Sequence, residues 1–431
     1  MSIGSLFWVL GVGLVLADTL KLSLDSALAI AQKNSPYRVE ERYHRTAAFQ
    51  RIAEPMEKIL PSPFFNLNYY QGEYEKGNLV IKEKSYQGAL GINQPIFSVD
   101  LLSGLVSIRH LYRYERAQAR LSRSELKYLT TTAYYDLLKI QEVYQVKKKE
   151  VAKKESLFLF SAEGYRLNKI SKIDLLRSEN DYYLAKMEEE NTLKSLTLAQ
   201  ENLKGVIGIK GDGFVHADGG LTEPESIAID FSDFFQNLIQ RNPELNAATE
   251  GKNLARLAYW SSIFNFLPSV SLSLSSNYTD SLSFPRRFSE WQNRAVSNLS
   301  LSLSFPFLDF SNYSLTLLAK SQEKRLKDLQ WKKTWLSLYQ SASDAYLSLK
   351  EAFSRYYYAK KNWELAKELL RLGEEERRLG RISYLDLLDI ETKYHNAYYL
   401  YIAAIAEIRE NEARIEYLLG PVASPRGEGK E

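Results

Sequence analysis

Two short motifs carry the residue types in this chain that are most able to do chemistry. SKID at residues 171–174 and SYLD at residues 383–386 each place a serine three residues before an aspartate. This spacing is typical of a helix start. There the serine hydroxyl accepts a hydrogen bond from a backbone N–H, and the negative carboxylate is stabilised by the positive end of the helix dipole. No nucleophile and base form a recognisable catalytic set, and the sequence contains no HExxH or Walker pattern. The four histidines have no metal-ligand spacing: His44, His110, His216 and His395. The sequence therefore predicts no enzyme, no metal site and no cofactor.

The amino-acid composition argues against a nucleic-acid-binding protein and favours a protein of the cell envelope or the exterior. The 431 residues include 56 Lys and Arg against 53 Asp and Glu, a balance that argues against a dedicated nucleic-acid binder. Cysteine is absent, which favours the cell envelope or the exterior and excludes disulfides and thiolate sites. The 29 tyrosines suit surfaces that are half wet and half apolar, including membrane interfaces.

The first residues predict export. Residues 3–17 are apolar and uncharged, are too few to span a membrane, and end in Val15-Leu16-Ala17, a pattern typical of a cleavage site. We interpret residues 1–17 as a signal peptide, with an uncleaved anchor as the alternative because the segment has no basic residue before its apolar run. No later segment approaches the length of an apolar membrane span, so we expect no transmembrane helix.

An internal duplication organises the rest of the chain. Leu60-Pro61 recurs as Leu267-Pro268, and RLNKISKIDLL at residues 166–176 recurs as RLGRISYLDLL at residues 378–388. The predicted organisation is a signal peptide (1–17), a first repeat (18–208), a linker or equatorial segment (209–229), a second repeat (230–420) and a disordered tail (421–431).

Each repeat has the same predicted helices. A short helix and a second helix that starts at a proline come first, and two strands follow. The next helix has about 70 residues, which corresponds to roughly 100 Å, and carries small residues at coiled-coil spacing. A turn and a last helix complete a long helical hairpin. The predicted helices are 23–33, 36–60, 100–167 and 171–208 in the first repeat, and 231–240, 243–267, 309–379 and 383–420 in the second.

The segments between these helices predict membrane strands. Leucine and aromatic residues alternate with serine, asparagine and glycine, over about the 9 to 11 residues that a tilted strand needs to cross a bilayer. The polar face of a soluble sheet would carry more Lys, Glu and Thr, whereas small uncharged residues suit a wide water-filled barrel. An open four-stranded sheet has unsatisfied edges in lipid, so two, three or four identical chains must combine their strands. The strands are predicted at 64–71, 86–94, 270–277 and 298–305.

Two prolines mark the places where strand changes to helix. Pro95 in NQPIFS and Pro306 in SFPFLDF follow the second strand of each repeat. Proline cannot donate to a strand ladder, and its fixed φ suits a helix start. We predict that Pro95 and Pro306 end the ladders and form the hinge between barrel and helices.

These residues and their order resemble the TolC-like outer membrane efflux protein family over nearly all of the chain after the signal peptide. The similar pieces are ALAIAQKNSPYR, QRNPELNAA, the Leu-Pro pair of each repeat, QPIFS, SFPFLDF, RLNKISKIDLL and RLGRISYLDLLDIE. The resemblance implies a mainly α fold with a membrane β-barrel. It implies a homotrimer in which duplicated hairpins form a periplasmic α-barrel and each protomer adds four strands to a 12-stranded barrel in outer-membrane lipid. It further implies a channel of a tripartite efflux or type I secretion system, which accepts substrates from an inner-membrane transporter and a periplasmic adaptor (membrane fusion) protein.

The resemblance also implies site residues at the hairpin tips. In the family, aspartates just past the turns line the closed periplasmic entrance, and they match Asp174 in the first repeat and Asp386 and Asp389 in the second. Asp174 and Asp386 are also the predicted capping residues. Basic tip residues either pair with these aspartates or face an acidic adaptor: Arg166, Lys169, Lys172, Arg377, Arg378 and Arg381. The residues expected to contact the adaptor are Leu167, Asn168, Ile170, Ser171, Leu379, Gly380, Ile382 and Ser383.

A soluble periplasmic coiled-coil adaptor or scaffold is the alternative function, because adaptors also carry a long helical hairpin. Two hairpins, each preceded by a pair of bilayer-length strands, favour the channel. The exported substrate, the pump and the adaptor do not follow from the sequence.

Overall fold

A computed structural model describes residues 20–76, 79–211, 213–224, 230–281, 283–305 and 310–421. The predicted signal peptide (1–17), the predicted tail beyond Pro421 and the predicted hinge residue Pro306 lie outside the described residues.

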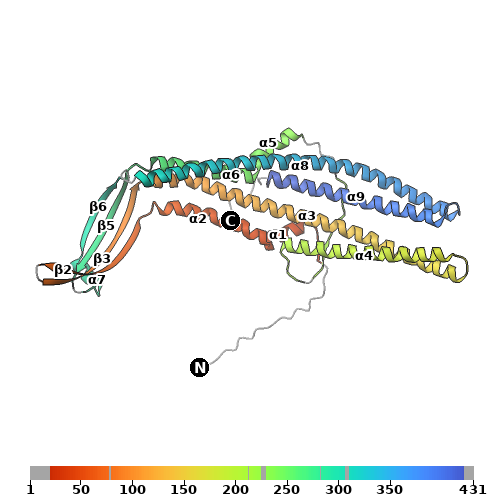
Figure 1. The fold of residues 1–431 in the computed structure, drawn as a ribbon, viewed down its shortest axis with the longest axis horizontal. Helices are drawn as coiled ribbons and strands as arrows, with labels where there is room; N and C mark the ends of the chain where they lie inside the picture. Colours follow the sequence, from red (N-terminus) through yellow and green to blue (C-terminus); the bar gives the residue numbers. More distant parts are fainter. Residues whose placement is uncertain are drawn as a thin grey trace, which may run out of the picture. The chain divides into compact units, whose positions relative to one another are not determined.

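The described chain passes through the same order of elements twice (Figure 1). Each pass has two helices, two strands, a very long helix and a last helix. The first pass contains α1 (Leu24–Asn34), α2 (Pro36–Glu57), β2 (Ser62–Lys76), β3 (Leu79–Phe97), α3 (Val99–Arg166) and α4 (Lys172–Ile207). The second contains α5 (Phe231–Arg241), α6 (Pro243–Phe264), β5 (Ser269–Asp280), β6 (Val296–Ser304), α8 (Phe310–Arg378) and α9 (Tyr384–Leu419). With 68 and 69 residues, α3 and α8 each have an axis about 100 Å long.

The chain forms two compact units. The first takes Met1–Glu41, Arg120–Asn242 and Tyr339–Glu431, and the second takes Arg42–Ala119 and Pro243–Leu338. The first unit therefore contains both hairpin tips, and the second contains the four-stranded sheet.

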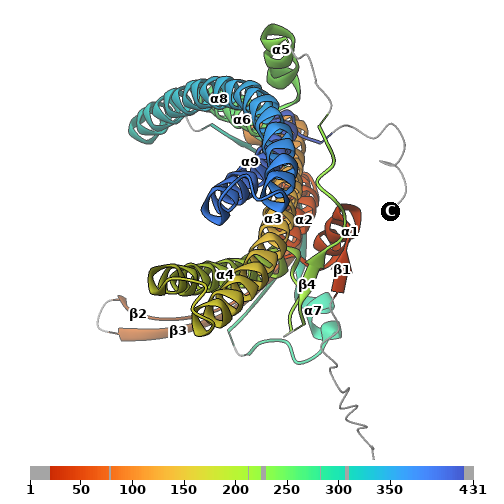
Figure 2. The same ribbon diagram turned by 90° about the vertical axis from the view of Figure 1, so that its right-hand side faces the viewer.

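The core of the first unit is built from leucine and alanine. Leu137 of α3 and Leu203 of α4 are completely buried, and Ala27 and Ala31 of α1 belong to the same cluster. Alanine allows helices to approach closely, so α1 packs against the larger side chains of α3 and α4 through its small residues. Alongside them β1 (Leu20–Leu22) pairs in parallel with β4 (Val215–Ala217), as Figure 2 shows. These two three-residue strands were not predicted, because so short a segment has no periodicity and its partner is far away in the sequence.

The sheet of the second unit has the strand order β2-β3-β5-β6, and all neighbours are antiparallel. Leu272 pairs with Leu301 and Leu274 with Leu299, so one face is a row of leucines. Ser273 pairs with Ser300 on the opposite face. Because side chains alternate along a strand, the sequence pattern alone fixes this division into an apolar and a hydroxyl-rich face.

The loops of the sheet differ from the prediction. We expected a polar loop between strands 64–71 and 86–94, but β2 and β3 remain paired as far as Lys76 and Leu79. Backbone pairing satisfies the N–H and C=O groups of this hairpin whatever its side chains are. The loop between β5 and β6 contains a helix, α7 (Phe288–Arg294), that was not predicted.

The prediction for Pro95 is wrong in one respect. Proline does not end the ladder: Pro95 pairs with Ser271, and β3 continues to Phe97. The register shifts between Pro95 and Phe97, because a residue without an N–H cannot complete the regular pattern there. Gln94 braces the bend, since its Nε2 donates to the carbonyl oxygens of Ile59 (2.8 Å) and Pro95 (2.9 Å).

No helix within the described ranges combines the length and the apolar character that a membrane crossing requires.

Candidate functional site

The two hairpin tips have the same backbone hydrogen bonds. At the first tip, the N–H of Lys169 donates to the Gly164 carbonyl over 2.8 Å, and the turn residue Asn168 has a φ of 56°. At the second tip, the N–H of Arg381 donates to the Glu376 carbonyl over 2.9 Å, and Gly380 has a φ of 72°. Both are helix ends closed by one left-handed residue, which Asn and Gly tolerate best.

The predicted capping residues begin the return helices. The hydroxyl oxygen of Ser171 accepts the Asp174 N–H over 3.1 Å, and that of Ser383 accepts the Asp386 N–H over 3.2 Å. In the second tip the Asp386 carboxylate also accepts the backbone N–H of Ser383 over 3.0 Å, which completes a capping box. Hydrogen bonds from the Ser383 hydroxyl and then from its backbone N–H hold the pKa of Asp386 below its ordinary value.

The three predicted entrance aspartates are exposed in this chain and have local contacts. Asp174 lies 4.0 Å from Arg177, Asp386 caps α9, and Asp389 lies 2.6 Å from Lys393 one turn further along the helix. A carboxylate at a helix start is favourable in any protein. The local contacts therefore explain why these residues are tolerated, and the entrance role of Asp174, Asp386 and Asp389 stays a prediction.

The basic residues of the tips contact their own hairpins. Arg166 pairs with Glu163 over 2.6 Å, Arg381 pairs with Glu376 over 3.2 Å, and Arg377 donates to the Ile382 carbonyl oxygen over 3.2 Å. The exposed basic side chains at the tips also include Lys169, Lys172 and Arg378. The glutamates that neutralise Arg166 and Arg381 lie three and five residues before them, so neither arginine needs the aspartates as a partner.

The residues predicted to contact an adaptor are mostly exposed. Leu167 is 52% exposed and Leu379 is 59% exposed. Ile170 and Ile382 are half-buried at the corresponding positions of the two turns. At the first tip Ile170 folds back over Gly164, where a Cβ would lie 2.5 Å from its Cδ1 atom. The structure thus places one exposed leucine and one half-buried isoleucine on each tip: Leu167, Asn168, Ile170 and Ser171 on the first, and Leu379, Gly380, Ile382 and Ser383 on the second.

A cavity of about 550 Å³ lies just behind the tips and joins the two hairpins of the first unit. Ile170 and Asp174 line it from the first hairpin, and Arg377 and Leu388 line it from the second. The structure therefore brings one predicted aspartate and one of the basic tip residues to the same space.

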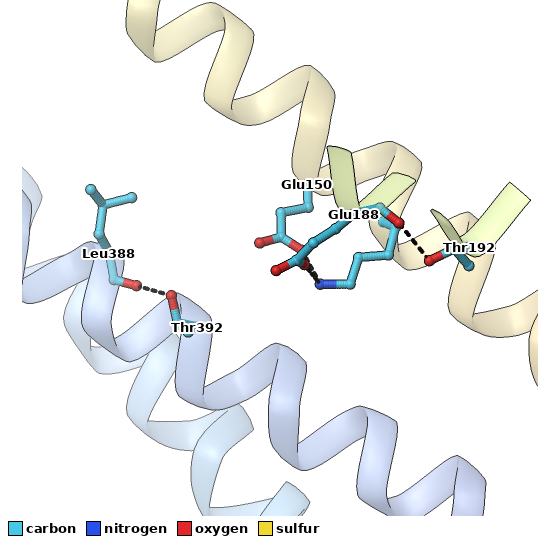
Figure 3. A network of polar contacts seen from close by, with 6 residues as sticks. Glu150, Glu188, Thr192, Leu388 and Thr392 are labelled. Carbon is cyan, nitrogen blue, oxygen red and sulfur yellow. Dashed lines mark hydrogen bonds and ion pairs between the residues drawn. The ribbon is translucent and has the colours of Figure 1, made fainter. Parts of the chain in front are cut away.

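A polar network that sequence reasoning missed lies further along the hairpins. The ammonium of Lys147 pairs with the carboxylates of Glu150, on its own helix α3, and of Glu188 on α4. Figure 3 shows how these two carboxylates point toward each other. Burial alone would lower the pKa of Lys147, but the hydrogen bonds to Glu188 and Glu150 outweigh it and raise the pKa above its ordinary value. The side chain is therefore a permanent cation that holds α3 against α4.

Helix α9 approaches the same network. Lys153 of α3 pairs with the buried Glu391 of α9, and His395 is half-buried one turn further on. Burial lowers the pKa of His395, against the attraction of Glu150 and Glu391. Its Nδ1 atom has no hydrogen-bond partner within the described part of the chain.

Two more ion pairs join α3 to α9 in the first unit. Lys127 pairs with Glu416, and Lys139 lies 3.9 Å from Glu410. With Lys153 and Glu391 they form a line of three contacts between the first hairpin and the second. No sequence signal identifies them, because the partners are more than 200 residues apart and each residue alone resembles an ordinary solvated charge.

A family model for outer membrane efflux proteins matches residues 234–421, which include the whole second hairpin. This segment of the chain matches that family. The predicted resemblance is thereby confirmed, and the outer membrane efflux proteins are transport channels rather than enzymes.

Solved structures share the fold of this chain over 92% of its length. The Campylobacter jejuni CmeC outer membrane channel matches with a TM-score of 0.77 at 12% identity, over 85% of its own length. A membrane protein from Pseudomonas aeruginosa matches with a TM-score of 0.77 at 16% identity, over 93% of its length. The open state of the Neisseria gonorrhoeae MtrE outer membrane channel matches with a TM-score of 0.74 at 19% identity, over 88% of its length. Comparison with curated protein sequences gave no match. At these sequence identities the structural similarity establishes the fold alone. It covers the first repeat as well, which the family model does not match.

Proposed function

We propose that this chain is the outer-membrane channel-tunnel of a tripartite efflux or type I secretion system. It acts as a homotrimer that receives substrates from an inner-membrane transporter through a periplasmic adaptor. The observation that carries the proposal is the sheet, which has one apolar face with an exposed row of leucines and one hydroxyl-rich face and is followed in each repeat by a helix about 100 Å long.

The apolar face of the sheet requires a cover. Leu299, Leu301 and Leu303 are 71%, 68% and 57% exposed. Leaving such a row in water forfeits about 25 cal/mol for each Å² that could be buried, whereas lipid tails would cover it without further protein. The serine and asparagine residues on the other face suit a water-filled lumen.

The edges of the sheet require partners. β2 and β6 are the outermost strands, and their outward N–H and C=O groups would be unsatisfied in a bilayer. Three copies of this sheet joined edge to edge give the 12-stranded barrel that the family resemblance implies. This closure removes the edges and makes the homotrimer the functional unit.

The tips then form the periplasmic entrance. Three-fold repetition would bring Asp174, Asp386 and Asp389 into rings around the axis, where carboxylates attract cations and repel one another. The exposed leucines Leu167 and Leu379 would provide apolar anchors for the adaptor.

Conductance tests the channel and its entrance together. Purified protein in planar bilayers should give single channels that prefer cations, and the double variant Asp386→Ala/Asp389→Ala should show weaker cation preference and altered conductance. Asp233→Ala removes one acidic residue from α5, away from the tips, and serves as the control. Channels of the double variant with unchanged conductance and ion selectivity would contradict the entrance role, and a wild-type protein that forms no channels would contradict the function.

Membrane fractionation distinguishes the alternative function. A soluble coiled-coil adaptor without a lipid anchor washes off membranes at high salt, whereas a barrel of this kind is released only by detergent. We expect the chain to stay in the outer-membrane fraction.

A further inference from the structure

The loop between β5 and β6 is folded onto the apolar face of the sheet. The indole of Trp291 in α7 is 6% exposed, stacks on Tyr278 of β5 with ring centroids 5.7 Å apart, and lies 6.0 Å from Phe65 of β2. Its Nε1 donates to the Ser276 hydroxyl over 3.1 Å. Gly88 of β3 permits this contact, because a Cβ there would collide with the indole ring.

The register shows which face this is. Gly88 pairs with Tyr278 and Ile92 with Leu274, so Trp291 lies on the same face as the row of leucines. Under the proposed function this is the face that meets lipid. Trp291 lies over the two central strands, β3 and β5, and its ring also reaches Phe65 of the edge strand β2.

Along the strands, the loop that carries α7 lies at the end of the sheet remote from the long helices (Figure 1). The ring of Phe284 contacts Tyr86 edge-on with centroids 5.0 Å apart, and Tyr86 contacts Tyr69 at the same distance. Aromatic rings that gather at one level of a membrane barrel mark the boundary between hydrocarbon and headgroups. The loop is thus held at the level of the lipid headgroups on the exterior side.

Two arginines of this loop are free at that level. Arg286 and Arg287 are exposed, and neither side chain has a partner among the described residues. The third arginine, Arg294, is bound to Asp280, and the Glu290 carboxylate accepts the backbone N–H of Arg286 over 2.9 Å. Phe288 follows the free pair directly and is 70% exposed.

We propose that α7 and the preceding Arg286-Arg287 pair form a binding site for the phosphate-bearing headgroup of an exterior-leaflet lipid. Guanidinium groups bind phosphate oxygens through charge-assisted pairs of hydrogen bonds. Phe288 would enter the acyl region beside the bound lipid, while Trp291 fixes the helix to the barrel wall. In the first hairpin β2 runs to Lys76 and β3 begins at Leu79, so its described residues contain no such helix and each protomer carries one site. The inference rests on the proposed function, because it requires the leucine face to lie in lipid.

A titration of lipid into nanodiscs tests the site. The full chain is placed in phosphatidylcholine discs with increasing fractions of diphosphoryl lipid A, and the thermal midpoint of the assembly is followed. We expect lipid A to raise the midpoint of the wild type. Arg286→Gln/Arg287→Gln should weaken the apparent affinity about 30-fold, from about 1 kcal/mol for each basic residue. Arg286→Lys/Arg287→Lys keeps both charges and should recover most of the effect.

Controls separate the possible outcomes. Arg325→Gln/Lys332→Gln removes two exposed charges from α8 and should behave as the wild type. Inorganic phosphate in solution should not replace the lipid. The site is overturned if the Arg286→Gln/Arg287→Gln variant responds to lipid A as the wild type does, or if inorganic phosphate stabilises equally well. It is also overturned if wild-type channels conduct normally but lipid A has no effect, a result that leaves the proposed function intact. A wild type that does not conduct contradicts the function instead.

Discussion

At the first hairpin tip the residue with positive φ is Asn168, and at the second it is Gly380. The flanking hydrogen bonds are the same, since Lys169 bonds back to Gly164 and Arg381 bonds back to Glu376. The second tip adds one contact, from the Ser383 N–H to the Asp386 carboxylate. The comparison teaches that the turn is fixed by its backbone path, and that two repeats can reach the same path with different local stabilisation.

The largest loss of stability at the tips should come from replacing the residue with positive φ in each turn. A left-handed conformation costs an ordinary residue about 1–2 kcal/mol, so Gly380→Ala should open the second tip about tenfold more often. Asn168→Ala should have a smaller effect, because Asn already bears part of that strain. Hydrogen exchange followed by mass spectrometry on peptides covering the tips would measure both. Equal protection in wild type and Gly380→Ala would show that the turn is held by contacts other than its own backbone.

Replacing the two capping aspartates, Asp386 and Asp174, should destabilise their tips by smaller and unequal amounts. Asp386→Ala removes the hydrogen bond from the Ser383 N–H and the favourable charge at the start of α9, so amide exchange at the second tip should become several-fold faster. Asp174→Ala should cost less, because the capping box is a feature of the second tip. The same exchange experiment compares them, and Glu190→Ala, which removes an exposed carboxylate further along α4, serves as a control. A larger loss of protection in Asp174→Ala than in Asp386→Ala would show that the capping box does not make the second tip the more dependent on its aspartate.

The smallest expected effect is the pH dependence of the second tip. The pKa of Asp386 is lowered from 3.8 by the Ser383 hydroxyl and N–H, so the unfolded tip binds the proton more tightly than the folded tip. Its stabilisation is therefore complete above about pH 4 and is lost as the pH falls through the lowered pKa. Exchange protection of the second tip, corrected for intrinsic rates, should decline below that pH in the wild type. The Asp386→Asn variant should lack this decline, and an identical decline in both would assign it to another group.

Much of the fold followed from the sequence, because it depends on local patterns. Ser171 and Ser383 are the N-caps at the positions predicted, and the long helices begin and end within one residue of the predicted limits. Alternation fixed which side chains of β5 and β6 share a face, because a strand has a period of two. The strands of the first hairpin were predicted too short, since polarity was taken as the end of pairing.

Part of the site could not be predicted in the same way. The tips were found because their signals lie within six residues of each other. The contacts of Lys153 with Glu391 and of Lys127 with Glu416 were not, because their partners lie on different hairpins. Trp291 was also missed, since nothing near it in the sequence shows that its ring will cover Gly88.

The sequence by itself determined the repeated order of elements, the helix limits, the turn chemistry and the two faces of the sheet, because each depends on residues close together in the chain. Only the tertiary structure decided which charges meet across α3 and α9, where Pro95 shifts the register, and where the loop helix α7 lies. Those features arise from groups separated by long stretches of chain, and their energies exist only after the backbone has brought the groups together.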